Sequence, residues 1–97
     1  MKENYIIAAF RETVAQRFPE QSVALNQLLD KKLSRLRSMH LNASKEKRFH
    51  LESQILPGIA VYETLQTVMP KDEALQTVRG YVAEHAWAMR KIILRLL

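Results

Sequence analysis

The chain has 97 residues, of which 47% are hydrophobic, and this predicts one globular domain with a single modest core and excludes a disordered chain. It contains no cysteine, which excludes disulfides, thiolate metal ligands and a cysteine nucleophile, and favours a cytoplasmic protein. The N-terminal apolar run is short for a signal peptide, and no run of about 18 uncharged apolar residues is present that could span a membrane.

The first predicted helix runs from Glu3 to Phe18. Its apolar residues recur at helical spacing, and Pro19 ends it because proline disfavours helix at the residue before it. The second predicted helix runs from Glu20 to about His40, after which Asn42 and Ser44 are both plausible N-caps for the next helix. The apolar stripes of the two helices are Ile6, Phe10, Val14 and Phe18, and then Leu25, Leu28, Leu29, Leu33, Leu36 and Met39.

The third predicted helix runs from Lys45 to about Met69 and contains Pro57-Gly58. Pro57 removes the hydrogen bond to the carbonyl of Ser53, which costs about 3 kcal/mol unless packing offsets it. The apolar phase passes through the proline without a shift, and this favours one kinked helix over a break at residues 54–56. The residues that define this phase are Leu51, Ile55, Ile59 and Tyr62.

The fourth predicted helix follows Pro70, with Asp72 and Glu73 in its first turn, where the helix dipole favours acidic residues. Its apolar face consists of Leu75, Val78, Val82, Ala86, Met89, Ile93 and Leu96. The sequence still reads as apolar helix at its last residues, so we expect a longer protein or an end docked on a partner subunit. The alternative is that the last turn packs in the chain's own core. The candidate interface residues are Ile92, Ile93, Leu96 and Leu97.

Together these segments predict an all-α fold, a small four-helix bundle-like domain over residues 1–97 with short connections. Such a domain could be the N-terminal part of a longer protein.

The net charge of +5 is concentrated in one stretch, which we call the basic window: Lys31, Lys32, Arg35, Arg37, Lys45, Lys47 and Arg48. Asp30 and Glu46 are the only acidic residues beside them. Such a cluster could bind nucleic acid or an acidic protein. The alternative is a solvated helix face without a partner.

The sequence shows no catalytic constellation. The nearest approach to a metal pair is Glu46 with His50, but the spacing of the di-iron bundles and their repeat are both missing. His85 is expected to be a packed residue, and Trp87 and Tyr81 are expected to pack in the core or an interface. Gly58 and Gly80 are expected to allow close helix contact. We therefore expect no metal and no cofactor.

The run Ile55-Leu-Pro-Gly-Ile-Ala-Val-Tyr62, followed by Leu65 and by Asp72-Glu-Ala-Leu75, resembles the N-terminal helical region of the L-2-amino-thiazoline-4-carboxylic acid hydrolase family. The resemblance is specific over about twenty residues. It implies a bacterial, cytoplasmic protein linked to thiazoline ring opening. The more conspicuous residues of the family, including cysteines, lie in a downstream α/β portion, so no catalytic residue transfers to this chain.

These observations predict a helical packing or oligomerisation domain that is without catalysis on its own. The expected partner is a second copy or a further domain. The alternative is a small basic module that binds nucleic acid or an acidic protein through the basic window.

Overall fold

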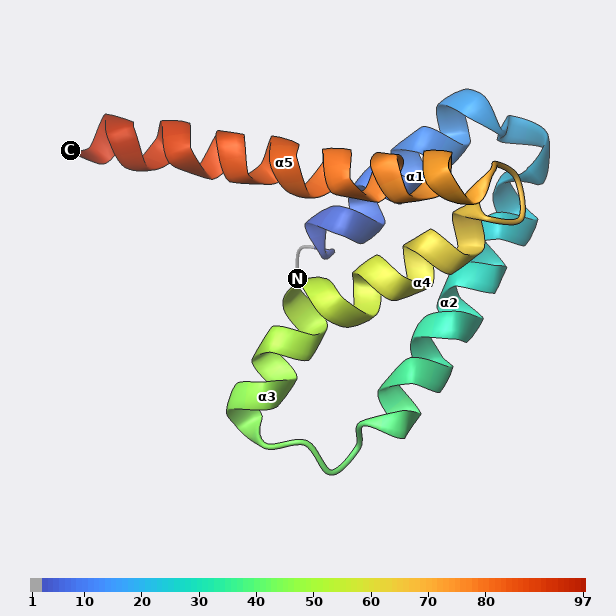
Figure 1. Cartoon of the computed structure of the whole chain (residues 1–97), viewed down its shortest axis with the longest axis horizontal. Helices are drawn as coiled ribbons and strands as arrows, with labels where there is room; N and C mark the ends of the chain where they lie inside the picture. The colour runs from blue at the N-terminus through green and yellow to red at the C-terminus, as the bar shows by residue number, and fades with distance from the viewer. Residues whose placement is uncertain (1–2) are drawn as a thin grey trace.

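The computed structural model describes residues 3–97, which form four helical rods and no strand, so the predicted all-α fold is confirmed (Figure 1). The third rod is continuous through α3, a π-helical segment and α4. The fourth rod, α5, is the longest and leaves the bundle at its C-terminal end. The helices are α1 (Tyr5–Arg17), α2 (Ser22–Met39), α3 (Lys45–His50), α4 (Leu56–Leu65) and α5 (Lys71–Leu96).

The boundaries of α1 and α2 differ slightly from those predicted, because Pro19 starts a 3₁₀ turn at Pro19–Gln21 instead of the second α-helix. The turn reverses the chain between the two helices, and α2 begins at Ser22. At the other end of α2, Ser44 is the N-cap of α3, as one of the two predictions had it, because its hydroxyl accepts the backbone N–H of Lys47 at 3.3 Å.

The rod through Pro57 bends without breaking, so the predicted kinked helix is confirmed and the alternative, a break at residues 54–56, is wrong. The five residues Leu51–Ile55 form a π-helical segment, in which the N–H of Leu56 donates to the carbonyl of Leu51, five residues earlier. A π turn holds one residue more than an α turn and therefore rotates the helix beyond it. Leu51 and Leu56 are both buried, whereas Ile55 and Ile59 are 48% and 39% exposed. The predicted unshifted phase through Ile55 and Ile59 is wrong for this reason.

Asn4 joins the start of α1 to this bend. Its Oδ1 accepts the backbone N–H of Ile6 at 2.9 Å and so caps α1. Its Nδ2 donates to the carbonyls of Glu52 and Ser53 at 3.2 and 2.9 Å. These are the two carbonyls that an N–H at position 57 would reach in the π or the α register, and Pro57 has no N–H. The Asn4 side chain therefore satisfies a free N–H at the start of α1 and two carbonyls at the bend.

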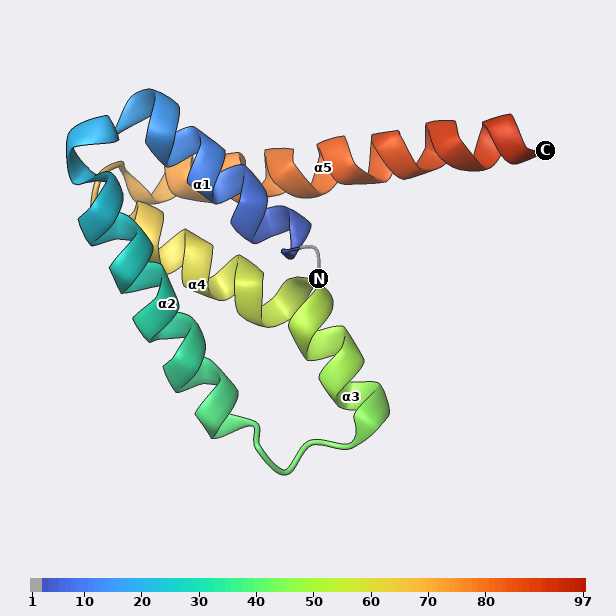
Figure 2. The ribbon, with the colours of Figure 1, turned by 180° about the vertical axis from the view of Figure 1, so that it is seen from behind.

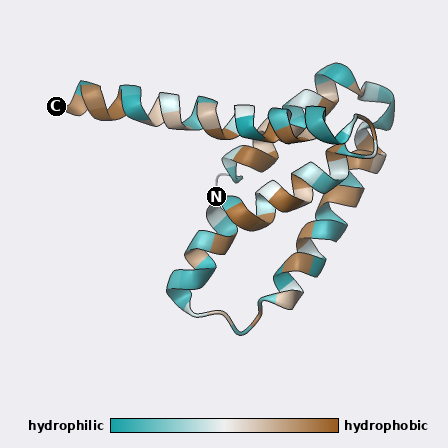
Figure 3. Ribbon diagram, in the orientation of Figure 1, coloured by the Kyte–Doolittle hydropathy of each residue, from teal (hydrophilic) through white to brown (hydrophobic). Residues whose placement is uncertain are grey.

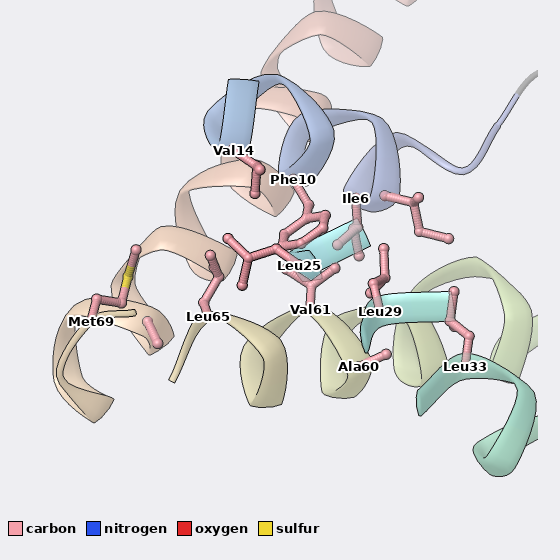
Figure 4. Packing of buried hydrophobic residues seen from close by; sticks show 12 residues of the cluster. Ile6, Phe10, Val14, Leu25, Leu29, Leu33, Ala60, Val61, Leu65 and Met69 are labelled. Atoms are coloured by element: carbon pink, nitrogen blue, oxygen red, sulfur yellow. The ribbon is translucent and has the colours of Figure 1, made fainter. Parts of the chain in front are cut away.

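The core lies where α1, α2 and α4 meet, and the N-terminal half of α5 covers it (Figure 4). Brown and teal bands alternate along these helices, as in helices with one apolar face and one polar face (Figure 3). The largest fully buried side chains are Phe10, Ile6, Leu29, Leu56, Leu65, Val14, Val61, Thr64 and Pro57. Thr64 is polar but donates to the carbonyl of Ala60 at 2.7 Å, so its burial leaves no donor unsatisfied.

Only the first half of α5 packs on this core. Ala74 is fully buried, and Val78, Tyr81 and Val82 are half-buried against the cluster. The hydroxyl of Tyr81 bonds Thr13 of α1. The imidazole of His85 stacks on the ring of Tyr5, with centroids 3.7 Å apart. Beyond this stack, α5 runs clear of the other helices in both views (Figures 1 and 2).

Candidate interaction surfaces

The C-terminal part of α5 and the residue after it, together residues 86–97, are exposed throughout, and we call this segment the α5 tail. The four predicted interface residues, Ile92, Ile93, Leu96 and Leu97, all lie in it, and their exposed fractions run from 49% to 97%. The alternative that the last turn packs in the chain's own core is therefore wrong.

The apolar stripe of α5 is one continuous face with spacings of four and three. It consists of Val78, Val82, His85, Met89, Ile92 and Leu96, with Ile93 beside it. Its first half packs on α1 and α4. Its second half has no neighbour among residues 3–97, because α1 begins at Tyr5, which stacks on His85. The α5 tail therefore continues the apolar face that packs in the core, but in the tail this face is exposed. Ala86, predicted on this face, is exposed as well.

The other side of the tail is cationic. Arg90, Lys91 and Arg95 are its charged side chains, and the last acidic residue before it is Glu84. Trp87 is 59% exposed, so of the two places predicted for it the core is wrong, and an interface stays a prediction. The ammonium of Lys91 lies 5.4 Å from the centroid of the Trp87 ring, within the range of a cation–π contact.

The basic window is partly neutralised by its own bundle. Lys32 pairs with Glu63 at 3.3 Å, and Arg37 pairs with Glu52 at 3.0 Å. Arg48 lies 3.8 Å from Glu52 and also donates to the carbonyl of His40. Within residues 3–97, the basic side chains of the window that make no ion pair are Lys31, Arg35, Lys45 and Lys47.

Two open hollows lie beside the window, near the end of α2. The first has a volume of about 400 Å³ and is lined by Asp30, Leu33, Ser34, Arg37, Ser38 and Leu41. The second has a volume of about 360 Å³ and is lined by residues 38–43 and Lys47. Neither brings together an acid, a base and a nucleophile in the manner of a catalytic site.

The remaining predicted features have structural roles or none. Among residues 3–97, no three His, Asp or Glu side chains are grouped so that they could hold a metal ion. A Cβ added at Gly58 or Gly80 would meet no atom of another helix within 4 Å, so the prediction that these glycines allow close helix contact is wrong. His85 is a packed residue as predicted, through its stack on Tyr5.

Comparison with known proteins adds no relative. No family model, curated protein or solved structure matches the chain. The resemblance to the thiazoline-carboxylate hydrolases therefore stays a prediction. Within the described part of the chain, every helix is too short or too polar to cross a membrane.

Proposed function

We propose that this chain is a helical packing module whose bundle holds the α5 tail free for attachment to a surface outside the bundle. One observation carries the proposal: a single apolar stripe is packed as far as His85 and exposed from Met89 to Leu96. Full burial of a large apolar side chain contributes about 1.5–3 kcal/mol, so covering the exposed parts of Met89, Ile92, Ile93 and Leu96 would contribute roughly 4 kcal/mol together.

The bundle also makes the tail ready to bind. An isolated helix of about 12 residues is marginal in water, because its first turn is costly to form. The tail continues a helix whose earlier turns are anchored by Tyr81 and His85. Nucleation is therefore complete before a partner arrives, and binding requires less ordering of the backbone.

Hydrophobic-interaction chromatography tests the module without assuming a partner. The double variant Ile92→Asp/Leu96→Asp should elute well before the unaltered chain, since it removes the apolar face. The matched control is Val23→Asp/Leu41→Asp, which places the same charges at two side chains that are each 72% exposed and lie off the tail. Equal retention losses in the two variants, or no loss in the tail variant, would contradict the proposal.

Packing on a second copy is one form of this attachment, and sedimentation velocity tests it separately. Self-association through the tail would make the sedimentation coefficient rise with concentration in the unaltered chain and not in Ile92→Asp/Leu96→Asp. A monomer at high micromolar concentration would exclude that form.

Binding of nucleic acid through the basic window has less support, because Glu52 and Glu63 already pair with three of its seven basic side chains. Such binding would weaken steeply with salt, as release of counterions requires.

A further inference from the structure

The charges of the α5 tail identify the kind of surface it fits. Its three charged side chains, Arg90, Lys91 and Arg95, are all basic. The acidic residues of the first turn of α5 are far away, because Glu73 lies 19 residues before Ile92, or about 28 Å along the helix. Glu73 is moreover paired with Arg17 at 2.9 Å. Glu84 precedes the tail on the same side as Lys91, but along residues 86–97 two tails would place only like charges together, so charge favours an anionic surface over a second copy.

The side chains of the tail divide into an apolar side and a side with all of its charges, as in helices that lie on a membrane surface. Met89, Ile92, Ile93 and Leu96 form the apolar side. Trp87, Lys91 and Arg95 follow one another at intervals of four residues on the other side, which also carries the exposed Leu94. Tryptophan concentrates at the headgroup level of bilayers, and lysine and arginine reach the same level with their long apolar stems. A helix with such a division lies in the plane of the interface.

The shape of the molecule permits this placement. The tail leaves the bundle beyond the stack of His85 on Tyr5 and touches no other helix there (Figures 1 and 2). A surface can therefore approach its apolar side without displacing a packed residue of the core.

We propose that the α5 tail binds the surface of a bilayer that contains anionic lipids, with Met89, Ile92 and Leu96 at the acyl boundary and the basic side chains among the headgroups. This inference rests on the proposed function, because it names the surface to which the packing module attaches. It requires no spanning segment.

The test uses the full chain with vesicles of phosphatidylcholine alone or of equal parts phosphatidylcholine and phosphatidylglycerol. Trp87 is the only tryptophan, so its emission reports directly on the tail. Anionic vesicles should shift the emission to shorter wavelength and carry the chain with them in sedimentation. Each basic residue near an anionic surface strengthens binding about fivefold, so neutral vesicles should bind on the order of 100-fold more weakly, and added salt should reduce the difference.

Two triple variants distinguish binding through the basic residues of the tail from a general effect of the net charge. Arg90→Gln/Lys91→Gln/Arg95→Gln should bind anionic vesicles on the order of 100-fold more weakly and keep its retention on the hydrophobic column. The matched control, Lys31→Gln/Arg35→Gln/Lys47→Gln, removes the same charge from the basic window and should bind within a few-fold of the unaltered chain. Equal losses in the two variants would overturn the assignment to the tail.

The remaining outcomes distinguish failure of the lipid inference from failure of the proposed packing module. Equal binding to neutral and anionic vesicles, or no binding to either, overturns the lipid inference. If column retention still depends on Ile92 and Leu96, the packing module stands and another occupant covers the tail. Concentration-dependent sedimentation that the tail variant abolishes would identify that occupant as a second copy. If retention does not depend on the tail, both proposals fail.

Discussion

Replacement of Asn4 tests whether one side chain stabilises both the start of α1 and the bend at Pro57. Asn4→Asp keeps an N-cap acceptor for Ile6, because aspartate and asparagine cap about equally well. It removes the two hydrogen bonds that Nδ2 donates to Glu52 and Ser53, and it places a carboxylate beside two carbonyl oxygens. Asn4→Ala removes the cap as well.

The magnitudes follow from these partners. A side-chain hydrogen bond contributes about 0.5–1.5 kcal/mol, so loss of the two in Asn4→Asp should lower the free energy of unfolding by about 2 kcal/mol. Asn4→Ala should lower it by about 3 kcal/mol, since loss of an N-cap adds about 1 kcal/mol. Urea unfolding followed by circular dichroism at the helix band measures both values.

Pro57→Ala supplies the control, because it restores a backbone N–H where the two carbonyls lack one. In that background Asn4→Asp should cost less by about 1 kcal/mol, a coupling that a double-mutant cycle isolates from the effect of Pro57 burial. Stability of Asn4→Asp within about 0.5 kcal/mol of the unaltered chain would refute the role assigned to Nδ2. A cost that is the same with and without Pro57 would refute its link to the bend.

Two further predictions concern the core and the pH dependence of stability. Leu56→Ala should lower the free energy of unfolding by about 2–5 kcal/mol, whereas Ile59→Ala should cost about 1 kcal/mol or less, because the π-helical segment turns Leu56 inward and leaves Ile59 39% exposed. Equal costs in urea unfolding would contradict this rotation. Burial raises the pKa of Tyr81 above its ordinary value near 10, against the opposing effect of its hydrogen bond with Thr13. The folded state then binds the phenolic proton more tightly than the unfolded state, so this stability is present below about pH 10 and is lost as pH rises from there. Tyr81→Phe should flatten the loss of stability above about pH 10 in thermal unfolding, and an unchanged slope would contradict it.

The helices could be predicted from the sequence because their apolar residues recur at helical spacing and their ends carry Pro19, Ser44 and Pro70. Which residues of the third rod face the core could not be predicted in the same way. A π turn between Leu51 and Leu56 leaves no mark in the pattern of hydrophobicity, and Ile55 and Ile59 fit the unrotated helix equally well. The role of Asn4 is equally hidden, since its carbonyl partners lie 48 and 49 residues away in sequence.

The tail was recognisable as amphipathic helix but its surroundings were not. Periodicity shows which side of a helix is apolar, but whether other helices of the chain reach that side depends on their lengths and positions. In this chain α1 starts at Tyr5, so its contact with α5 reaches only as far as His85. The absence of acidic residues after Glu84 is visible in the sequence and could have separated the tail from the acidic start of the same helix.

The π-helical segment also makes the chain unusually tolerant of a change in length at one place. Loss of one residue between Leu51 and Leu56 would convert a spacing of five into a spacing of four, and both leucines would still lie on one helical face. The same loss within α2 would rotate everything beyond it by about 100° and turn part of its stripe of leucines toward water. Deletions should therefore be accepted in the third rod at residues 52–55, at the cost of the bonds from Asn4, and rejected in the second.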